Sequence, residues 1–394
     1  MIFQTFDDKE DCILIYQNKQ FHDTFNDLQL TSTWSYANYL KDKDIEYARL
    51  WVQGLSLADV CPPHKQDDLK CVEKQLKAFI RSCSEAKIDL DDICFYELAP
   101  KGYLRDYADV KNEICAHVFK SKEKPANYDH ILNLVKVISD IRYRPLNLDL
   151  SKMNNAAIRD KNTFHTVSSC QKYVSYDPFK TVTGRLSTNR GFFPALTLGK
   201  EYRNILTPDN DWLFELDFNA AELRTVLALL GQEQPEEDLH DWNIENVFKG
   251  QVTREEAKKR VFAWLYNPSS SDYMLNRTYD RDKIKETYFR NNKVYTDYNR
   301  EIQCDDFHAT NYIIQSTAAD VLFEQMYKVW RLLEGKRSFI KFCNHDSIMI
   351  DFSEEDQDII NDIKELFSDT RYGKFKINCF GGKRWGSMKK LRIY

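Results

Sequence analysis

Two aspartates beside short apolar segments constrain this chain more than any other feature. The first segment, WLFELDF at residues 212–218, runs directly into the helical pattern AAELRTVLALL, so Asp217 stands where a buried strand meets a helix. The second is a pair of apolar runs, FIKFC (339–343) and IMIDF (348–352), which flank NHDS and predict a tight β-hairpin with Asp346 at its tip. An unpaired charge beside such strands is unfavourable, so each aspartate is either a solvated turn residue or part of a polar site.

The two aspartates suit the same ligand. Carboxylates that converge from a strand end and a hairpin tip would hold Mg²⁺, which takes oxygen ligands and completes its shell with water and phosphate oxygens. The pair therefore predicts a site for two Mg²⁺ ions, with Mn²⁺ as an alternative, at Asp217 and Asp346. Either aspartate taken alone is interpreted more simply as a solvated turn residue.

The composition is that of an ordinary soluble protein. No apolar run approaches the roughly 18 residues of a membrane span, and the first residues, MIFQTFDDKED, are acidic where an export signal would be basic and then apolar. The ten cysteines are scattered without a repeating spacing, which favours reduced thiols over a disulfide framework. We therefore expect a cytoplasmic protein with no membrane partner.

Charge is unevenly distributed along the chain. The net charge of −5 argues against a nucleic-acid partner, yet residues 371–394 contain eight Lys and Arg and no Asp or Glu. Phe375, Phe380, Trp385 and Tyr394 lie among the cations of this basic C-terminal segment. Phosphate binding needs local cations rather than a basic protein, so the segment is interpreted either as a polyanion-binding strip or as a solvated tail.

A helix is predicted over residues 253–266, TREEAKKRVFAWLY. Thr253 is a suitable N-cap, and Glu256 three residues later completes the pattern of a capping box. Side chains at four-residue steps share one slowly twisting face of a helix. On this face lie two cations and two aromatic rings: Arg254, Lys258, Phe262 and Tyr266. The alternative is a solvated cationic half joined to an aromatic half that faces a core.

Further elements are predicted along the chain. MIFQTF and CILIY are expected to form two strands joined by a turn, and a mostly helical stretch follows from about residue 67 to residue 140. The region of Pro145 marks a boundary. A helix over 317–333 is ended by Gly335, and an acidic helix follows the hairpin at 353–367.

Five segments of the chain resemble, in order and spacing, motifs of the family A DNA polymerases. This group contains bacterial DNA polymerase I and many phage replicases. The three polymerase motifs are DFNAAELR (217–224), TREEAKKRVFAWLY (253–266) and NHDS (344–347). TGRLS (183–187) resembles the primer-contact motif, and IIQSTAAD (313–320) resembles the start of the conserved palm helix. The resemblance covers about residues 94–394. It implies an α+β right-hand polymerase fold with an antiparallel-sheet palm, a helical thumb and shortened helical fingers.

The resemblance also implies a division of the chain. The segments are a small N-terminal region of unknown role (1–90), a thumb (91–145), a first part of the palm (146–235), fingers (236–300) and a second part of the palm with the basic C-terminal segment (301–394). Only 33 residues separate Tyr266 from Arg300, which implies trimmed fingers. Because about 90 residues are too few for the ribonuclease-H-like proofreading domain of the family, we expect a compact phage-type replicative polymerase that lacks the 3′-5′ exonuclease domain.

Individual roles follow from the same resemblance. Asp217, Asp346 and the backbone carbonyl of Phe218 would hold the two metal ions, and Lys258 would join the two aspartates as a catalytic residue. The nucleotide would be bound by Arg254, Lys258, Phe262, Tyr266, His240 and Glu222. Primer–template contacts would come from Arg185, Gln315, His345 and Arg224.

Three positions depart from the family or have a simpler interpretation. Ser347 stands where the family has Glu after His-Asp, so the metal site would be limited to two aspartates and a carbonyl. His240, as a lone histidine, could be merely structural. Gln315 could be a surface residue near a helix start.

The implied activity is template-directed DNA synthesis in replication or repair, in which deoxynucleotides are added to a primer 3′-hydroxyl by a two-metal nucleotidyl transfer without proofreading. Its partners would be primer–template DNA, deoxynucleoside triphosphates and accessory replication proteins. A single-subunit RNA polymerase is the enzymatic alternative, and Glu222 argues against it because those enzymes have a small residue there. A catalytically silent DNA-binding module is the other alternative, and it would not need Arg254 and Lys258 beside the two aspartates.

Overall fold

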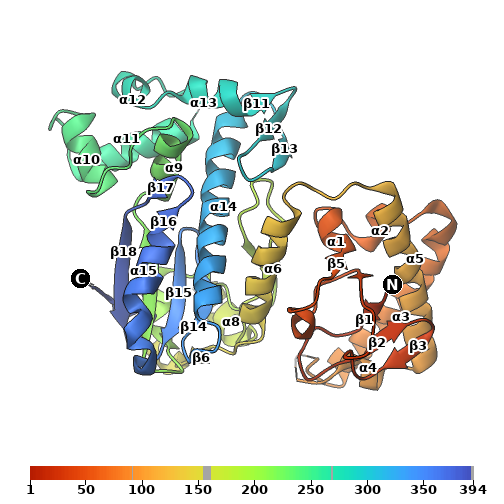
Figure 1. Cartoon of the computed structure of the whole chain (residues 1–394). Coiled ribbons are helices and arrows are strands. Elements are labelled where there is room, and N and C mark those ends of the chain that lie inside the picture. The colour runs from red at the N-terminus through yellow and green to blue at the C-terminus, as the bar shows by residue number, and fades with distance from the viewer. Residues whose placement is uncertain (91, 154–160, 268, 392–394) are drawn as a thin grey trace. The chain divides into compact units, whose positions relative to one another are not determined.

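The computed structural model describes residues 1–90, 92–153, 161–267 and 269–391. The chain forms two compact units, Met1–Asp140 and Ile141–Tyr394 (Figure 1). The boundary expected near Pro145 lies within a few residues of this division. The expected N-terminal region and nearly all of the expected thumb fall together in the first unit, and the finer division into five segments stays a prediction.

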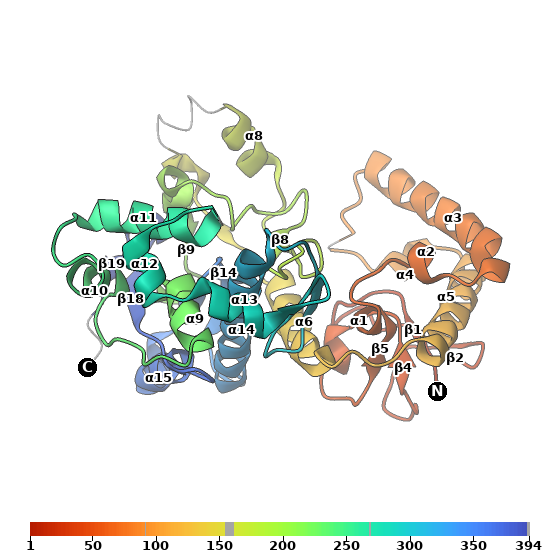
Figure 2. The same cartoon turned by 90° about the horizontal axis from the view of Figure 1, so that it is seen from above.

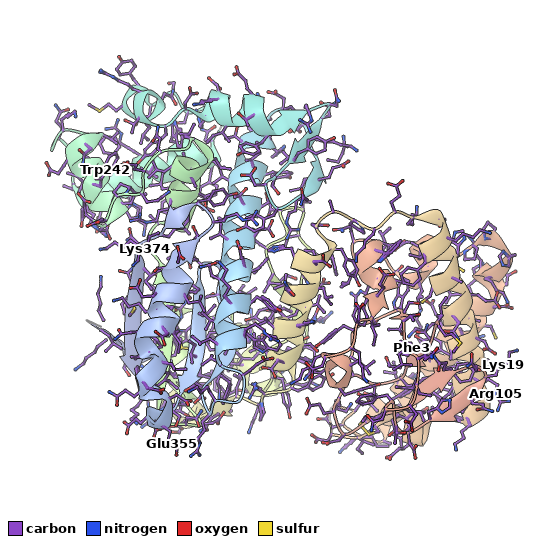
Figure 3. The ribbon with its side chains drawn as sticks, viewed as in Figure 1. Phe3, Lys19, Arg105, Trp242, Glu355 and Lys374 are labelled. Carbon is purple, nitrogen blue, oxygen red and sulfur yellow. A yellow bond between two sulfur atoms is a disulfide. The ribbon has the colours of Figure 1, made fainter. Side chains whose placement is uncertain are left out.

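The first unit joins small sheets to long helices. Strands β1 (Gln4–Thr5), β2 (Ile15–Gln17) and β3 (Gln20–His22) are antiparallel, which agrees with the two strands predicted at the start of the chain. The remaining elements are β4 (Ser32–Thr33), β5 (Glu46–Tyr47), α1 (Ala48–Trp51), α2 (Leu57–Val60), α3 (Gln66–Glu85), α4 (Phe95–Leu98), α5 (Lys101–Ser121) and α6 (Tyr128–Arg142). Apolar side chains of α3 and α5 form much of a hydrophobic core in this unit. Phe3, labelled in Figure 3, is also fully buried.

A disulfide corrects the expectation that all cysteines are reduced. Cys12 and Cys94 are bonded, with their Cα atoms 5.4 Å apart, and the bond ties the segment before β2 to the residue that precedes α4. The two residues are separated by 82 positions in the sequence, so only the packing of the first unit brings them together. In the described part of the chain the other eight cysteines are free.

The second unit is built on a five-stranded antiparallel sheet with the strand order β14-β15-β10-β18-β19. The strands are β10 (Trp212–Phe218), β14 (Phe339–Cys343), β15 (Ser347–Phe352), β18 (Ile377–Gly382) and β19 (Lys389–Lys390). The hairpin predicted around NHDS is therefore present as β14 and β15. The strand WLFELDF becomes β10, between the hairpin and the C-terminal strands. Every residue of β15 is buried, because both of its faces are covered.

Helices α14 (Ala309–Leu332) and α15 (Ile360–Ser368) lie against this sheet (Figure 1). Phe218 of β10 stacks on Phe367 of α15 with ring centroids 4.5 Å apart, which seals this face of the strand. Since side chains alternate along a strand, Glu215 and Asp217 point to the opposite face. The acidic helix predicted after the hairpin begins as a 3₁₀ helix, Glu354–Ile359, and continues as α15.

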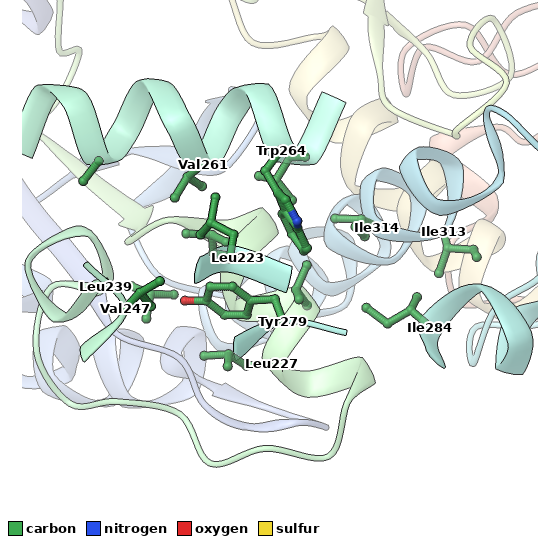
Figure 4. Close-up of a cluster of buried hydrophobic side chains, with 14 of the residues drawn as sticks. Leu223, Leu227, Leu239, Val247, Val261, Trp264, Tyr279, Ile284, Ile313 and Ile314 are labelled. Atoms are coloured by element: carbon green, nitrogen blue, oxygen red, sulfur yellow. The ribbon is translucent and has the colours of Figure 1, made fainter. Parts of the chain in front are cut away.

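A cluster of helices surrounds a hydrophobic core in this unit. It contains α9 (Ala221–Leu229), α10 (Leu239–Asn246), α11 (Arg254–Tyr266), α12 (Tyr273–Thr278) and α13 (Arg281–Tyr288), and Figure 2 shows α11 to α13 from above. Leu223, Val261, Trp264 and Tyr279 pack together with Ile313 and Ile314 of α14 (Figure 4). The capping box predicted at Thr253 and Glu256 is present at the start of α11.

Short elements connect these layers. They are β6 (Asn147–Leu148), α8 (Lys161–Ser169), β7 (Tyr176–Asp177), β8 (Ser187–Thr188), β9 (Leu206–Thr207), β11 (Phe289–Arg290), β12 (Lys293–Tyr295), β13 (Glu301–Gln303), β16 (Asp369–Thr370) and β17 (Gly373–Lys374), with 3₁₀ helices at Asn38–Leu40, Pro63–Lys65, Leu150–Lys152, Lys200–Ile205 and Trp385–Ser387. Among the described residues, no helix combines the length and the hydrophobicity of a membrane span.

The basic C-terminal segment is not a solvated tail over its described residues, 371–391, because it forms β17, β18 and β19. Most of its cations already have partners within the protein. Arg371, Lys374 and Arg384 form ion pairs with Glu324, Glu365 and Asp149, and Lys376 and Lys383 donate to backbone carbonyls. Lys374 is labelled in Figure 3. Arg392 and Tyr394 lie outside the described residues. The segment therefore does not present one continuous strip of available cations.

Candidate active site

The sheet register brings Asp217 and Asp346 together. Asp217 is paired with Ser347, the residue after Asp346, on the neighbouring strand β15. The backbone N–H of Phe218 donates to the carbonyl oxygen of Asp346 at 3.0 Å. Both aspartates line one cavity of about 760 Å³, whose walls come from the sheet, α9, α10 and α11.

The same cavity collects most of the residues to which the motifs assigned a role. Its lining includes Arg185, Asp217, Phe218, Glu222, His240, Arg254, Lys258, Phe262, Tyr266, His345 and Asp346. These residues come from segments that lie far apart in the sequence. The structure thus gathers into one cavity residues that the sequence connected only through a resemblance.

The electrostatics of the two aspartates suit a divalent cation. Burial and, after it, the charge of the adjacent Asp346 carboxylate together raise the pKa of Asp217 to about 7, although a hydrogen bond of 3.2 Å from Asn378 Nδ2 acts in the opposite direction. Burial also raises the pKa of Asp346. Crowded carboxylates of this kind are stabilised in their charged form by a bound cation, so the oxygen donors present fit Mg²⁺.

The cluster of protein ligands is small. Across residues 1–90, 92–153, 161–267 and 269–391, no three or more His, Cys, Asp and Glu side chains form a group that could hold a metal ion. Water and phosphate oxygens would have to complete the shell, as is usual for Mg²⁺.

Helix α11 presents its predicted stripe to the cavity. Phe262 and Tyr266 are 38% and 41% exposed and stack with ring centroids 5.9 Å apart, whereas Val261 and Trp264 on the other side of the helix are buried. The alternative in which the aromatic half faces the core is therefore wrong. Lys258 lies 5.6 Å from the centre of the Phe262 ring, so cation and aromatic ring form one surface.

Arg254 is held in place by two acids of α10. Its Nη2 lies 3.0 Å from Asp238 Oδ2, and its Nε lies 2.9 Å from Asp241 Oδ1. Although burial opposes it, hydrogen bonds from Asn219 and the charge of Arg254 hold the pKa of Asp238 below its usual value. Lys258 forms no ion pair with any described residue. It is therefore more available to a ligand in the cavity than Arg254.

Glu222 joins three segments at one end of the cavity. One carboxylate oxygen accepts from Arg185 Nη2, and the other accepts from the hydroxyl of Tyr266. The first turn of α9 is thereby connected both to the TGRLS turn and to the last turn of α11. Because both oxygens are engaged, the side chain has a defined position within the cavity.

His240 is buried in the cavity wall on α10. Burial is the main cause that lowers its pKa, and the charges of Arg254 and Lys258 act in the same direction, against the charges of Asp238 and Asp241. Within the described part of the chain its Nδ1 atom has no hydrogen-bond partner. A ring with an unsatisfied nitrogen beside two cations is suited to a polar ligand in the cavity.

A buried ion pair supports the turn that carries Arg185. Arg300 donates from Nε and Nη2 to the two carboxylate oxygens of Asp320 on α14, each at 2.7 Å. The guanidinium group lies directly against Gly184, whose φ is +75°. A side chain at 184 would both adopt an unfavourable backbone conformation and overlap the Arg300 guanidinium.

We expect Gly184→Ala to lower the free energy of unfolding by about 1–3 kcal/mol and to weaken primer–template binding, because the turn that orients Arg185 must move. The measurements are chemical denaturation and DNA titration. Gly335→Ala is the matched control, since Gly335 has a φ of +74° and a methyl group added there would meet nothing within 4 Å. Equal losses of DNA affinity in the two variants would contradict the proposed support of Arg185.

Arg224 is not placed for a DNA contact, which corrects the expectation for this residue. Its side chain is fully buried. It donates to the backbone carbonyls of Asn219, Pro235 and Glu237 at 2.9–3.0 Å. Burial lowers the pKa of this guanidinium to about 10. Arg224 therefore stabilises the connection between α9 and α10, and the motif alone could not distinguish this role from a surface contact.

The other two expected primer–template residues lie in different positions. His345 is at the tip of the hairpin, lines the cavity and is exposed. Partial loss of hydration beside neighbouring groups, together with the charge of Arg185, lowers its pKa. Gln315 is half-buried on α14, one helical turn before Ala319, and does not line the cavity itself.

Several polar lining residues were not found from the sequence. They are Lys200, Arg203, Glu215, Asn378 and Lys390. Glu215 could have been found, because it lies two residues before Asp217 on the same face of a predicted strand. Asn378 and Lys390 depend on the pairing of β18 with β10 and β19, which no local pattern indicates.

Comparison with known proteins gives one sequence relative and a solved structure. No family model matches the chain. It is 23% identical to DNA polymerase I of Borreliella burgdorferi over 343 residues, which covers 73% of this chain and 36% of the relative. The chain thus spans about a third of the length of that relative. The structure is similar to that of the POL domain of Pol1 from M. smegmatis in complex with DNA primer-template and dNTP, with a TM-score of 0.56 and 14% identity over 73% of this chain and 76% of that chain.

The solved structure shows the fold of the chain. The α+β architecture is that of a DNA polymerase domain. In sequence and in fold, the chain resembles the family A DNA polymerases, as its motifs predicted.

Proposed function

We propose that this chain is a DNA-directed DNA polymerase that adds deoxynucleotides to a primer 3′-hydroxyl by nucleotidyl transfer, with two Mg²⁺ ions as cofactors. The observation that carries the proposal is the single cavity in which Asp217 and Asp346 face the cation- and ring-bearing side of α11. The relative and the fold neighbour, both polymerases by name, support it. In this proposal the five-stranded sheet is the palm and α10 to α13 belong to the fingers.

The residues of the cavity divide the chemistry between them. Metal ions held by Asp217, Asp346 and the Phe218 carbonyl would lower the pKa of the attacking hydroxyl and shield the triphosphate charge. Lys258 and His240 would bind phosphate oxygens, and Arg254 would exchange its carboxylate partners for them. Phe262 would stack near the incoming nucleoside.

Primer–template contacts would be independent of sequence. The minor-groove acceptors of all four base pairs occupy nearly the same places, so donors aimed at them sense pair geometry alone. Arg185, Gln315 and His345 are proposed to do this at the primer terminus, and Tyr266 would close the site over the template base. The proposal includes no editing step.

The RNA polymerase alternative is disfavoured by Glu222. Its carboxylate is anchored by Arg185 and Tyr266 inside the cavity that contains Asp217. A nucleotide whose phosphates reach the aspartates would place its sugar beside this side chain. A DNA-binding module without catalysis gains no support from the arrangement, because it would not need the aspartates to share a cavity with Lys258.

The test is incorporation of single nucleotides by the purified chain. Four primer–templates that differ only in the templating base are each offered one deoxynucleotide at a time with Mg²⁺. We expect extension only by the complementary nucleotide on each template, and none after chelation of the metal. Extension without regard to the template, or no extension of any primer with Mg²⁺ or Mn²⁺, would contradict the proposal.

Replacement of the available cation tests the nucleotide site. We expect Lys258→Ala to lower kcat/KM for the deoxynucleotide by about 10²-fold, because a charge that stabilises the transferring phosphates is removed. Lys259→Ala is the matched control, since Lys259 is an exposed neighbour on the same helix outside the cavity. A loss that appears only in DNA affinity would make this helix a DNA-binding face instead.

A further inference from the structure

A further carboxylate, Glu215, lies beside the two aspartates on the sheet side of the cavity, which Glu222 and Asp238 also line. Glu215 lies two residues before Asp217 on β10, so both side chains point to the face of the sheet that lines the cavity. Its Oε1 atom accepts a hydrogen bond of 2.9 Å from the hydroxyl of Ser347. Ser347 is paired with Asp217 on the neighbouring strand and directly follows Asp346. The serine that donates to Glu215 is therefore a direct neighbour of both aspartates, of Asp217 across the sheet and of Asp346 along the chain.

The charge of Glu215 is not balanced by an ion pair with any described residue. The nearest candidates are already engaged. Arg203, which lines the same cavity, stacks on Trp385 at 4.3 Å and directs its Nε to the carbonyl of Leu198. Lys390 donates to the side-chain oxygen of Asn378. The three carboxylates therefore lie on one side of the cavity, where Arg203 and Lys390 act on them through their charge without forming an ion pair among the described residues.

An arrangement of this kind is unfavourable without a cation in the cavity. Ser347 is the residue that departs from the family motif, and it donates to the one extra acid on this wall. The hydroxyl of Ser347 is short, and the longer Glu215 side chain reaches it from the adjacent strand β10.

We propose that Glu215 is a positioning carboxylate of the metal site, which strengthens the retention of the divalent cation at Asp217 and Asp346 by its charge and by accepting hydrogen bonds from the water of that cation. This inference rests on the proposed function. Ser347 orients Glu215 for the task. Partners of metal ligands that act in this way typically contribute about 10- to 100-fold in metal affinity.

The test measures Mn²⁺ binding to the full chain by electron paramagnetic resonance, with primer–template DNA present and no nucleotide. We expect Glu215→Gln to weaken Mn²⁺ binding at least about 10-fold. The change is isosteric and keeps an oxygen that can accept from Ser347, so folding should be preserved, and thermal unfolding checks this. Glu301→Gln is the control, because Glu301 is exposed on β13, outside the cavity.

A swap of the two positions gives a second, independent readout. We expect the double variant Glu215→Ser with Ser347→Glu to recover Mn²⁺ affinity that Glu215→Ser alone loses, because the carboxylate returns to the wall from the hairpin strand. Unchanged Mn²⁺ affinity in Glu215→Gln, while Asp217→Asn loses it, would overturn the inference and leave the proposed function intact. If Mn²⁺ does not bind the wild type, or Asp217→Asn leaves binding unchanged, both fail.

Discussion

Asp217→Asn and Asp346→Asn are each expected to lower the rate of primer extension by about 10³-fold or more, because each removes an anionic ligand on which the metal ions depend. Primer–template affinity should stay within a few-fold of wild type, since phosphate contacts elsewhere supply most of the binding. Rapid-quench extension and DNA titration measure the two quantities on the same protein.

The two variants need a control that perturbs the surroundings of Asp217 without removing a carboxylate. Asn378→Ala provides one, because it removes the 3.2 Å hydrogen bond to Asp217 while both carboxylates are kept. We expect a loss much smaller than in either aspartate variant. Near-normal turnover in Asp217→Asn or Asp346→Asn would contradict the metal assignment.

The second large effect concerns the sugar of the nucleotide. Glu222→Ala should raise the use of ribonucleotides by about 10²-fold, because the space beside the sugar C2′ is opened and a 2′-hydroxyl no longer misaligns the reacting groups. Use of deoxynucleotides should fall much less, although Arg185 and Tyr266 both lose their acceptor. Single-nucleotide incorporation with each sugar measures the ratio.

Glu222→Gln is the matched control, because it keeps the size of the side chain and an oxygen that can accept a hydrogen bond. If the exclusion is steric, this variant should still reject ribonucleotides. A wild type that takes both sugars equally, or a Glu222→Ala variant with unchanged sugar choice, would favour the RNA polymerase alternative.

Much of the second unit could be predicted because its strands and helices have strong local patterns. The strand that ends at Asp217, the hairpin around Asp346 and the capped helix α11 each have a pattern that is visible within about fifteen residues. A shared metal site for the two aspartates was a hypothesis from their settings, and the addition of α11 to that site was expected only from a resemblance. The sequence alone could not show it, because sheet register and helix packing depend on contacts between distant segments.

The failures have the same physical origin. Arg224 was assigned to DNA from its motif, but its donors are occupied by the carbonyl of Asn219 before α9 and by two carbonyls of the loop between α9 and α10. The bond between Cys12 and Cys94 depends on the packing of the first unit. In the basic C-terminal segment, pairing with Glu324, Glu365 and Asp149 uses charges that a count along the chain treats as available.

The most direct test of the proposed polymerase site is a structure of the full chain with a dideoxy-terminated primer–template, the complementary deoxynucleoside triphosphate and Mg²⁺. We expect the nucleotide to lie in the cavity of about 760 Å³, with its phosphates at Lys258 and the two aspartates and its sugar against Glu222. We also expect the primer terminus to lie beside Arg185. A nucleotide bound elsewhere, or a primer end remote from Asp217 and Asp346, would contradict the proposed site.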